Sequence, residues 1–193
     1  MLFRSIVPTG AKIAVLENGG WDYAVGNHEP DRVFVVDGAG DPPALVAEGD
    51  YVDILDVGGV LFVIERSGKI LRSDGTAAGT TVVDDAAWDH GWSTDHAVVG
   101  DRLFYEKLFP VETEQGTSWV GSVWAVGATG PAAEVASAGY PDHADAGEFV
   151  PAFGSLGFVV SNWDEAARRY SRHLWKVESD GDVERVSDME VDY

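Results

Sequence analysis

The sequence contains no cysteine among its 193 residues. This absence excludes disulfides, thiolate metal ligands and cysteine nucleophiles together. No apolar run approaches the roughly 20 residues that a membrane-spanning helix requires, so we expect no membrane insertion. The first eight residues contain neither an apolar core segment nor a small-residue cleavage site, and this predicts no signal peptide. We therefore expect the protein to act in the cytoplasm or within a larger assembled particle.

Positive charge is also scarce. Thirteen Lys and Arg residues stand against thirty-three Asp and Glu, which gives a formal net charge of −20, and only four of the cations are lysine. A surface of this sign repels phosphate, so nucleic acid is not an expected partner. Scarce lysine with abundant aspartate is typical of salt-loving microbes, but a GC-rich genome favours the same residues. Composition leaves both explanations open.

Helical periodicity is nearly absent as well, because the only plausible helical turn is 164–169. The chain consists of short apolar runs, rich in Val, Phe, Trp and Tyr, that alternate with polar residues and end at Gly or Asp. This pattern is typical of strands and predicts an all-β protein. A hydrophobic fraction of 45% indicates an ordinary globular domain.

The clearest local element is a β-hairpin at 69–84. We predict strands at 70–72 and 80–83, with Asp74-Gly75 and Gly79 at the turn positions that need a positive φ. Two further strands, 52–57 and 60–64, precede this hairpin. A lone hairpin is too small to be stable, so we expect further copies of this four-stranded unit.

The same arrangement recurs four times. The turns between first and second strands contain Gly10, Gly58, Gly100 and Gly154. The third strands carry the apolar anchors Phe34, Leu71, Trp124 and Trp175. A spacing near 50 residues predicts a single domain, 1–193, folded as a four-bladed β-propeller with blades at about 1–50, 51–87, 88–139 and 140–193. A β-sandwich is the alternative. We expect each anchor to pack against the next blade, so replacing Trp124 or Trp175 with alanine should cost ~3–5 kcal/mol.

The segment 71–80, Leu-Arg-Ser-Asp-Gly-Thr-Ala-Ala-Gly-Thr, resembles the ELWxxDGT repeat of bacterial tandem-repeat proteins. Weaker echoes occur at Leu174-Trp175 with Asp180-Gly181, at Val123-Trp124, and at Val33-Phe34 with Asp37-Gly38. Because such repeats are similar to β-propeller blades, the resemblance implies that fold. It implies no catalytic residues.

The long connections carry the candidate binding residues. In an up-and-down blade, the first and third turns lie at one end and the other connections at the opposite end. The long segments all belong to the second class, namely 17–31, 84–95, 108–121, 137–147 and 161–172, and loops on a rigid scaffold commonly bind ligands. The candidates are Trp21, Asp22, His28, Trp88, Asp89, His90, Trp92, Trp119, Tyr140, Asp142, His143 and Trp163. The alternative is that these rings close over the blade ends as small cores.

The sequence shows no catalytic or metal-binding motif. We find no His-x-x-x-His pair, EF-hand loop, Gly-x-Ser-x-Gly or phosphate-binding loop, and no two of the many acids stand out as a glycosidase pair. We therefore expect no metal or cofactor. The function predicted is a non-catalytic protein-interaction or structural module, such as a virion subunit, that binds protein partners through the long-loop face. A homo-oligomeric eight-bladed ring is one assembly to test. The alternative is a carbohydrate-binding or carbohydrate-active protein using the same face.

Overall fold

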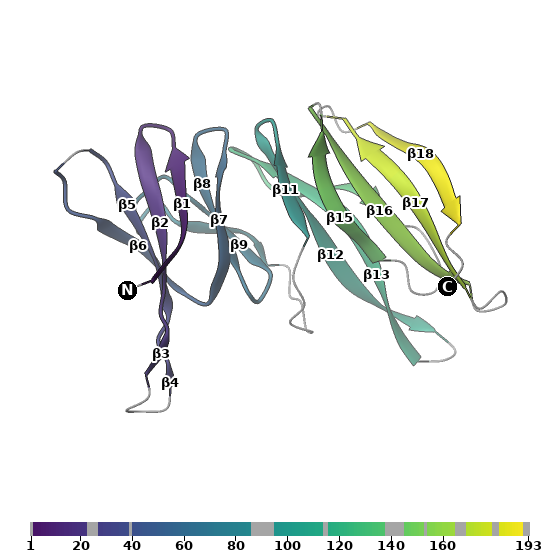
Figure 1. Cartoon of the computed structure of the whole chain (residues 1–193), viewed down its shortest axis with the longest axis horizontal. Helices are drawn as coiled ribbons and strands as arrows, with labels where there is room; N and C mark the ends of the chain where they lie inside the picture. The colour runs from purple at the N-terminus through teal and green to yellow at the C-terminus, as the bar shows by residue number, and fades with distance from the viewer. Residues whose placement is uncertain are drawn as a thin grey trace. The chain divides into compact units, whose positions relative to one another are not determined.

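The computed structural model describes residues 2–22, 27–38, 40–85, 95–113, 116–137, 145–152, 154–164, 169–178 and 182–190. Within these ranges the secondary structure is all β, as predicted, and no helix has the length and hydropathy of a membrane span. The chain divides into two compact units, Met1–Ser93 and Thr94–Tyr193. Each unit contains two four-stranded antiparallel sheets (Figure 1).

In the first unit, the first sheet has the strand order β1-β2-β5-β6 and the second has β7-β8-β9-β10. The strands are β1 (Leu2–Thr9), β2 (Lys12–Asn18), β5 (Asp31–Val36), β6 (Ala44–Gly49), β7 (Tyr51–Val57), β8 (Val60–Glu65), β9 (Lys69–Ser73) and β10 (Thr81–Asp85). A small hairpin of β3 (Trp21–Asp22) and β4 (Asn27–His28) projects from the β2–β5 connection (Figure 1). We call it the β3–β4 arm.

In the second unit, the third sheet has the order β11-β12-β13-β14 and the fourth has β15-β16-β17-β18. Their bounds are β11 (His96–Val99), β12 (Arg102–Thr113), β13 (Gly116–Gly127), β14 (Ala133–Ser137), β15 (Asp145–Ala152), β16 (Ser155–Asp164), β17 (Arg169–Val177) and β18 (Val183–Glu190). Apart from the inserted arm, every strand pairs with its sequence neighbour within each sheet. This confirms the predicted four-stranded pattern in all four copies.

The first turn of each sheet is a two-residue hairpin connection. Gly10, Gly58 and Gly100 occupy its first position with φ of 59°, 60° and 62°, a left-handed conformation that favours glycine. Gly154 also has a positive φ, 82°, but it occupies the second position. The predicted equivalence of the four glycines therefore holds for three, while the fourth is shifted by one residue.

The β9–β10 hairpin is confirmed and is held by its own side chains. Of the residues expected to have a positive φ, Gly75 does, at 91°, whereas the expectation for Asp74 and Gly79 is wrong. The Asp74 carboxylate accepts hydrogen bonds from the Thr76 backbone N–H at 2.9 Å and the Thr76 hydroxyl at 2.7 Å. These two bonds, the hydroxyl first, lower the pKa of Asp74. From the first sheet, Lys12 Nζ donates to the Asp74 carbonyl oxygen at 3.2 Å. The loop that most resembles a repeat motif is therefore a structural element joining the two sheets.

The core of the first unit lies between its two sheets. Ala14, Leu16, Val33 and Val35 of the first sheet share one buried cluster with Ile54, Leu61, Val63 and Leu71 of the second. Leu71 thus packs against another sheet, but that sheet is the preceding one, whereas the next one was predicted. Phe34 does not, because it alternates with Val33 and Val35 and points to the opposite face.

The second unit has an equivalent core between the third and fourth sheets. Phe104, Val123, Ala125, Leu156, Phe158 and Val160 are buried there, and Trp175 packs against them. Trp175 therefore packs on a core between sheets, as predicted, although its partner is the preceding sheet and not the next one. The prediction for Trp124 is wrong. Trp124 lies between Val123 and Ala125 on β13, so strand alternation points it away from this core.

Three of the long segments predicted as irregular loops are largely β structure. β12 and β13 pair continuously out to Thr113 and Gly116, and β16 and β17 pair out to Asp164 and Arg169. Trp119 and Trp163 accordingly lie in strands, as do Trp21, Asp22 and His28 of the β3–β4 arm. The expected helical turn at 164–169 is wrong at both ends, because Asp164 is the last residue of β16 and Arg169 is the first residue of β17. Residues 165–168 lie outside the described residues.

Candidate functional site

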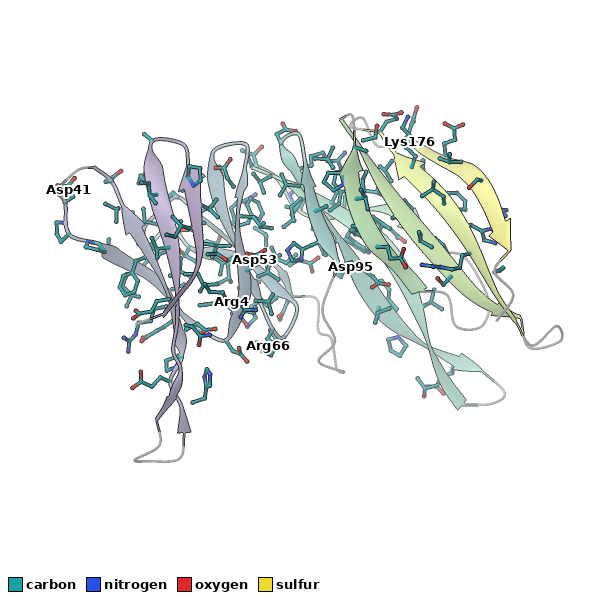
Figure 2. All side chains as sticks on the ribbon, in the orientation of Figure 1. Arg4, Asp41, Asp53, Arg66, Asp95 and Lys176 are labelled. Atoms are coloured by element: carbon teal, nitrogen blue, oxygen red, sulfur yellow. The ribbon has the colours of Figure 1, made fainter. Side chains whose placement is uncertain are left out.

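A cleft of about 480 Å³ opens in the first unit at the base of the β3–β4 arm. Its walls come from the beginnings of β1 and β5, the ends of β2 and β6, and the β8–β9 turn. Figure 2 shows Arg4 and Arg66 at this end of the unit. The lining residues are Arg4, Asn18, His28, Pro30, Asp31, Gly49, Asp50 and Arg66. This is the end that carries the longer connections, where we expected binding to occur.

Asp31 forms the structural floor of the cleft. Its side chain is buried, with the residue 3% exposed, and its Oδ1 accepts a hydrogen bond from the Gly19 N–H at 2.9 Å. Its Oδ2 accepts from the Tyr51 N–H at 3.1 Å. A carboxylate can be buried at such a position because both oxygens are hydrogen-bonded to backbone donors. Asp31 therefore ties the base of the arm to the first residue of the second sheet.

Two arginines line the opening of the cleft and are anchored at neighbouring positions. Arg4 Nη1 donates to the Tyr51 carbonyl oxygen at 3.2 Å, and Arg66 Nε donates to both carboxylate oxygens of Asp50 at 3.0 and 3.1 Å. Asp50 and Tyr51 are consecutive, so their Cα atoms lie about 3.8 Å apart. The fold thereby brings together two cations that are distant in sequence.

The backbone of Tyr51, which bonds to both Arg4 and Asp31, is held in place by the packing of its ring. Its ring is buried in the core of the first unit and packs so closely against Gly49 that a Cβ at Gly49 would lie 2.9 Å from the ring. Burial raises the pKa of Tyr51 to about 12, and the charges of Glu65, Glu48 and Asp31 contribute in the same direction. The phenol therefore stays protonated at neutral pH.

The cleft differs in charge from the chain as a whole. Two arginines and two aspartates give it a formal charge of zero, against −20 for the full sequence. The Arg66 side chain is 51% exposed, whereas Asp31 is hidden and fully engaged by backbone donors. A ligand that enters the cleft therefore meets the two guanidinium groups and the Asp50 carboxylate, which is 63% exposed and already bonded to Arg66 Nε, but not the buried Asp31 carboxylate.

Only part of the predicted site can be compared with this cleft. His28 lines it and is exposed, and Trp21 and Asp22 pair with His28 and Asn27 in the adjoining arm. The backbones of Trp119 and Trp163 lie in the second unit. The remaining candidates, namely Trp88, Asp89, His90, Trp92, Tyr140, Asp142 and His143, lie outside the described residues.

Sequence reasoning did not find Arg4, Asn18, Asp31, Asp50 or Arg66. One signal was available, since cations are rare in this chain and both Arg4 and Arg66 lie near strand ends on the long-loop side. The aspartates gave no signal because acids are abundant everywhere.

A second aromatic feature lies on β12 and β13. Lys107 Nζ sits 4.0 Å from the centroid of the Trp124 ring and 5.9 Å from that of Phe109, and the Trp124 indole N–H donates to Ser122 Oγ at 2.8 Å. A cation over an aromatic face is a favourable contact in itself. Because lysine already covers Trp124, this ring is a poor platform for a stacked ligand.

The chain matches no protein-family model and no curated protein. The resemblance to the ELWxxDGT repeat therefore depends on the hairpin residues alone and stays a prediction. In the described residues, no group of three or more His, Asp or Glu side chains could hold a metal ion.

Proposed function

We propose that this protein is a non-catalytic interaction module, built as a closed four-bladed β-propeller, that binds a partner at the end of its sheets carrying the β arms. The first support is the repetition of one four-stranded sheet, with the same strand order, four times. The second is that β1 packs beside β7 in the first unit and β11 beside β15 in the second. Adjacent first strands are expected of neighbouring propeller blades.

The apolar outer face of the first sheet supports closure of the ring. Ile6, Val15, Phe34 and Leu45 are directly paired across all four strands of the first sheet, on the face opposite its core. Ile6 is 64% exposed and Leu45 is 46% exposed. Exposed apolar positions such as Ile6 and Leu45 mark a surface that a closed ring would cover.

Light scattering tests this closure. A closed four-bladed ring gives the mass of one chain, 20.7 kDa, at both moderate and high salt. The mass of two chains would instead indicate an eight-bladed ring made from two copies and would refute the closed monomer.

The observation that carries the binding proposal is the contrast between the two ends of the first, third and fourth sheets. At one end, every first turn has only two residues. At the other end, β12–β13 and β16–β17 extend as long hairpins, and the β3–β4 arm stands over a polar cleft. Elaborated segments on a rigid scaffold are where binding surfaces usually lie.

Shortening the β3–β4 arm tests this proposal. Glu29 N–H donates to the Gly20 carbonyl oxygen at 3.0 Å, so the ends of the arm are close enough to join with a short turn. We expect a partner cross-linked in the native source to be captured by the intact chain and lost on shortening. A matched control, Asp101→Lys in the β11–β12 turn, should retain it.

Equal capture by the shortened chain would contradict the proposal. Hydrolysis of a neutral oligosaccharide, abolished by replacing a single Asp or Glu, would replace it with the carbohydrate-active alternative.

A further inference from the structure

We infer that the cleft of the first unit binds a small monoanionic carboxylate of the sugar-acid class, held by Arg4 and Arg66. Every lining residue belongs to the first unit, so the inference depends neither on ring closure nor on a protein partner. The volume of about 480 Å³ lies within the usual range of small-molecule sites, roughly 300–1,000 Å³.

The hydrogen bonding of the two guanidinium groups leaves donors for a ligand. Arg66 uses only Nε on the Asp50 carboxylate, so both terminal amino groups have no hydrogen-bond partner among the described residues. Arg4 uses only Nη1, on the Tyr51 carbonyl oxygen, and makes no ion pair with the described part of the chain. Guanidinium groups match the planar geometry of a carboxylate with parallel N–H donors.

Anchoring makes these donors effective. Each guanidinium is already held by one bond to Asp50 or Tyr51, so binding a ligand immobilises less of each side chain. Such preorganisation lowers the entropic cost of association. The sequence contains thirty-three acidic residues, yet Arg4 forms no ion pair with any described carboxylate.

The net charge of the chain favours a monoanionic ligand over a dianionic one. A chain of −20 repels an approaching anion, and the repulsion of a dianionic phosphate is about twice that of a monoanionic carboxylate. The locally neutral cleft can accept one negative charge between its arginines. The same argument disfavours polyphosphates and nucleic acids.

The remaining walls suit a hydroxylated ring. Asn18 Oδ1 accepts from the Gly20 N–H at 3.1 Å, while its side-chain NH₂ group has no partner among the described residues. Pro30 adds an apolar surface, and His28 adds an exposed polar one. An amide donor beside an apolar ring can contact a sugar hydroxyl and the adjoining C–H face.

A nuclear magnetic resonance titration of the full chain tests this inference with three matched probes: D-glucuronate, D-glucose and D-glucose 6-phosphate. We expect glucuronate to shift the backbone amides of Asn18, Gly49, Asp50 and Arg66 with a saturable dependence on concentration. We expect glucose, which lacks the carboxylate, to bind at least about 10-fold more weakly. Glucose 6-phosphate should also bind more weakly than glucuronate.

Arginine variants connect these shifts to the cleft. Arg4→Gln and Arg66→Gln should each weaken glucuronate binding by about 10-fold or more, because each removes charge-assisted hydrogen bonds. Arg32→Gln is the matched control, since Arg32 Nε makes a similar exposed bond to Glu48 at 3.0 Å but does not line the cleft. Thermal melting verifies folding, and Arg66→Gln suffices if Arg4→Gln does not fold.

Three kinds of outcome would overturn the inference. The first is the absence of a saturable shift with glucuronate. The second is equal binding of glucose, or an equal loss with Arg32→Gln. The third is tighter binding of glucose 6-phosphate, which would assign the cleft to phosphate.

Discussion

Replacing Asp31 with asparagine tests whether one buried carboxylate joins the arm to the second sheet. Asn keeps the shape of the side chain but offers one acceptor oxygen to two backbone donors, Gly19 N–H and Tyr51 N–H, which lie 2.9 and 3.1 Å from the carboxylate. The amide NH₂ then faces a second donor, so one buried N–H loses its partner.

The expected magnitude follows from those two bonds. A hydrogen bond to a charged group contributes about 1.5–3 kcal/mol, and an unsatisfied buried donor costs about 1–3 kcal/mol. We therefore expect Asp31→Asn to lower the free energy of unfolding by about 2–4 kcal/mol. Because domains are stable by only about 5–15 kcal/mol, this loss would be easy to measure.

Urea titration at fixed salt, monitored by tryptophan fluorescence, is the appropriate assay. The midpoint should fall while the m-value stays constant, since the surface exposed on unfolding is unchanged. Asp37→Asn is the control, because Asp37 is 65% exposed and lies 3.6 Å from Lys12 Nζ. Such exposed pairs contribute little, so the control should lose under about 0.5 kcal/mol. An Asp31→Asn midpoint equal to that of the control would refute the reasoning.

Further expectations concern the hairpin, the buried phenol and the two strand tryptophans. A Cβ at Gly79 would lie 2.2 Å from the Asp74 carboxylate, so Gly79→Ala should lower Tm by about 2–4 °C, and an unchanged melting curve would contradict this. An alkaline absorbance titration should show Tyr51 ionising near its raised pKa of about 12. Because this pKa is higher in the folded chain than in the unfolded one, the contribution of the neutral phenol to stability is full below pH ~10 and is lost as the pH rises towards 12. In urea titration, Trp175→Ala should lower the free energy of unfolding by ~3–5 kcal/mol. Trp124→Ala should lower it by only about 1–2 kcal/mol, because Trp124 faces away from the core between the third and fourth sheets. Equal losses would argue against these opposite orientations.

The sequence was sufficient to predict four strands in each copy, although not their full length, because the signals of a strand and its turn are local. A period-two pattern and a glycine at the turn describe each hairpin without reference to the rest of the chain, as at Gly10, Gly58 and Gly100. The 71–80 segment was recognisable because its turn is held by its own side chains.

It was harder to predict which side chains of each strand point towards the core between the sheets. Phe34, Leu71, Trp124 and Trp175 looked equivalent in sequence, but only Leu71 and Trp175 pack on a core between sheets. A shift of one residue in aligning two strands exchanges the faces of every side chain, and nothing local in the sequence fixes that alignment.

Only the tertiary structure determined the cleft. The aromatic segments that looked like loops form strands, because each of them pairs with the adjacent strand across a hairpin. Arg4 and Arg66 line the same cleft because β1 packs beside β7, which brings the Arg4 guanidinium to Tyr51, next to the Asp50 that holds Arg66. Sequence patterns encode which residues form strands, whereas the contacts that build a site join residues far apart in the chain and exist only once the sheets have packed.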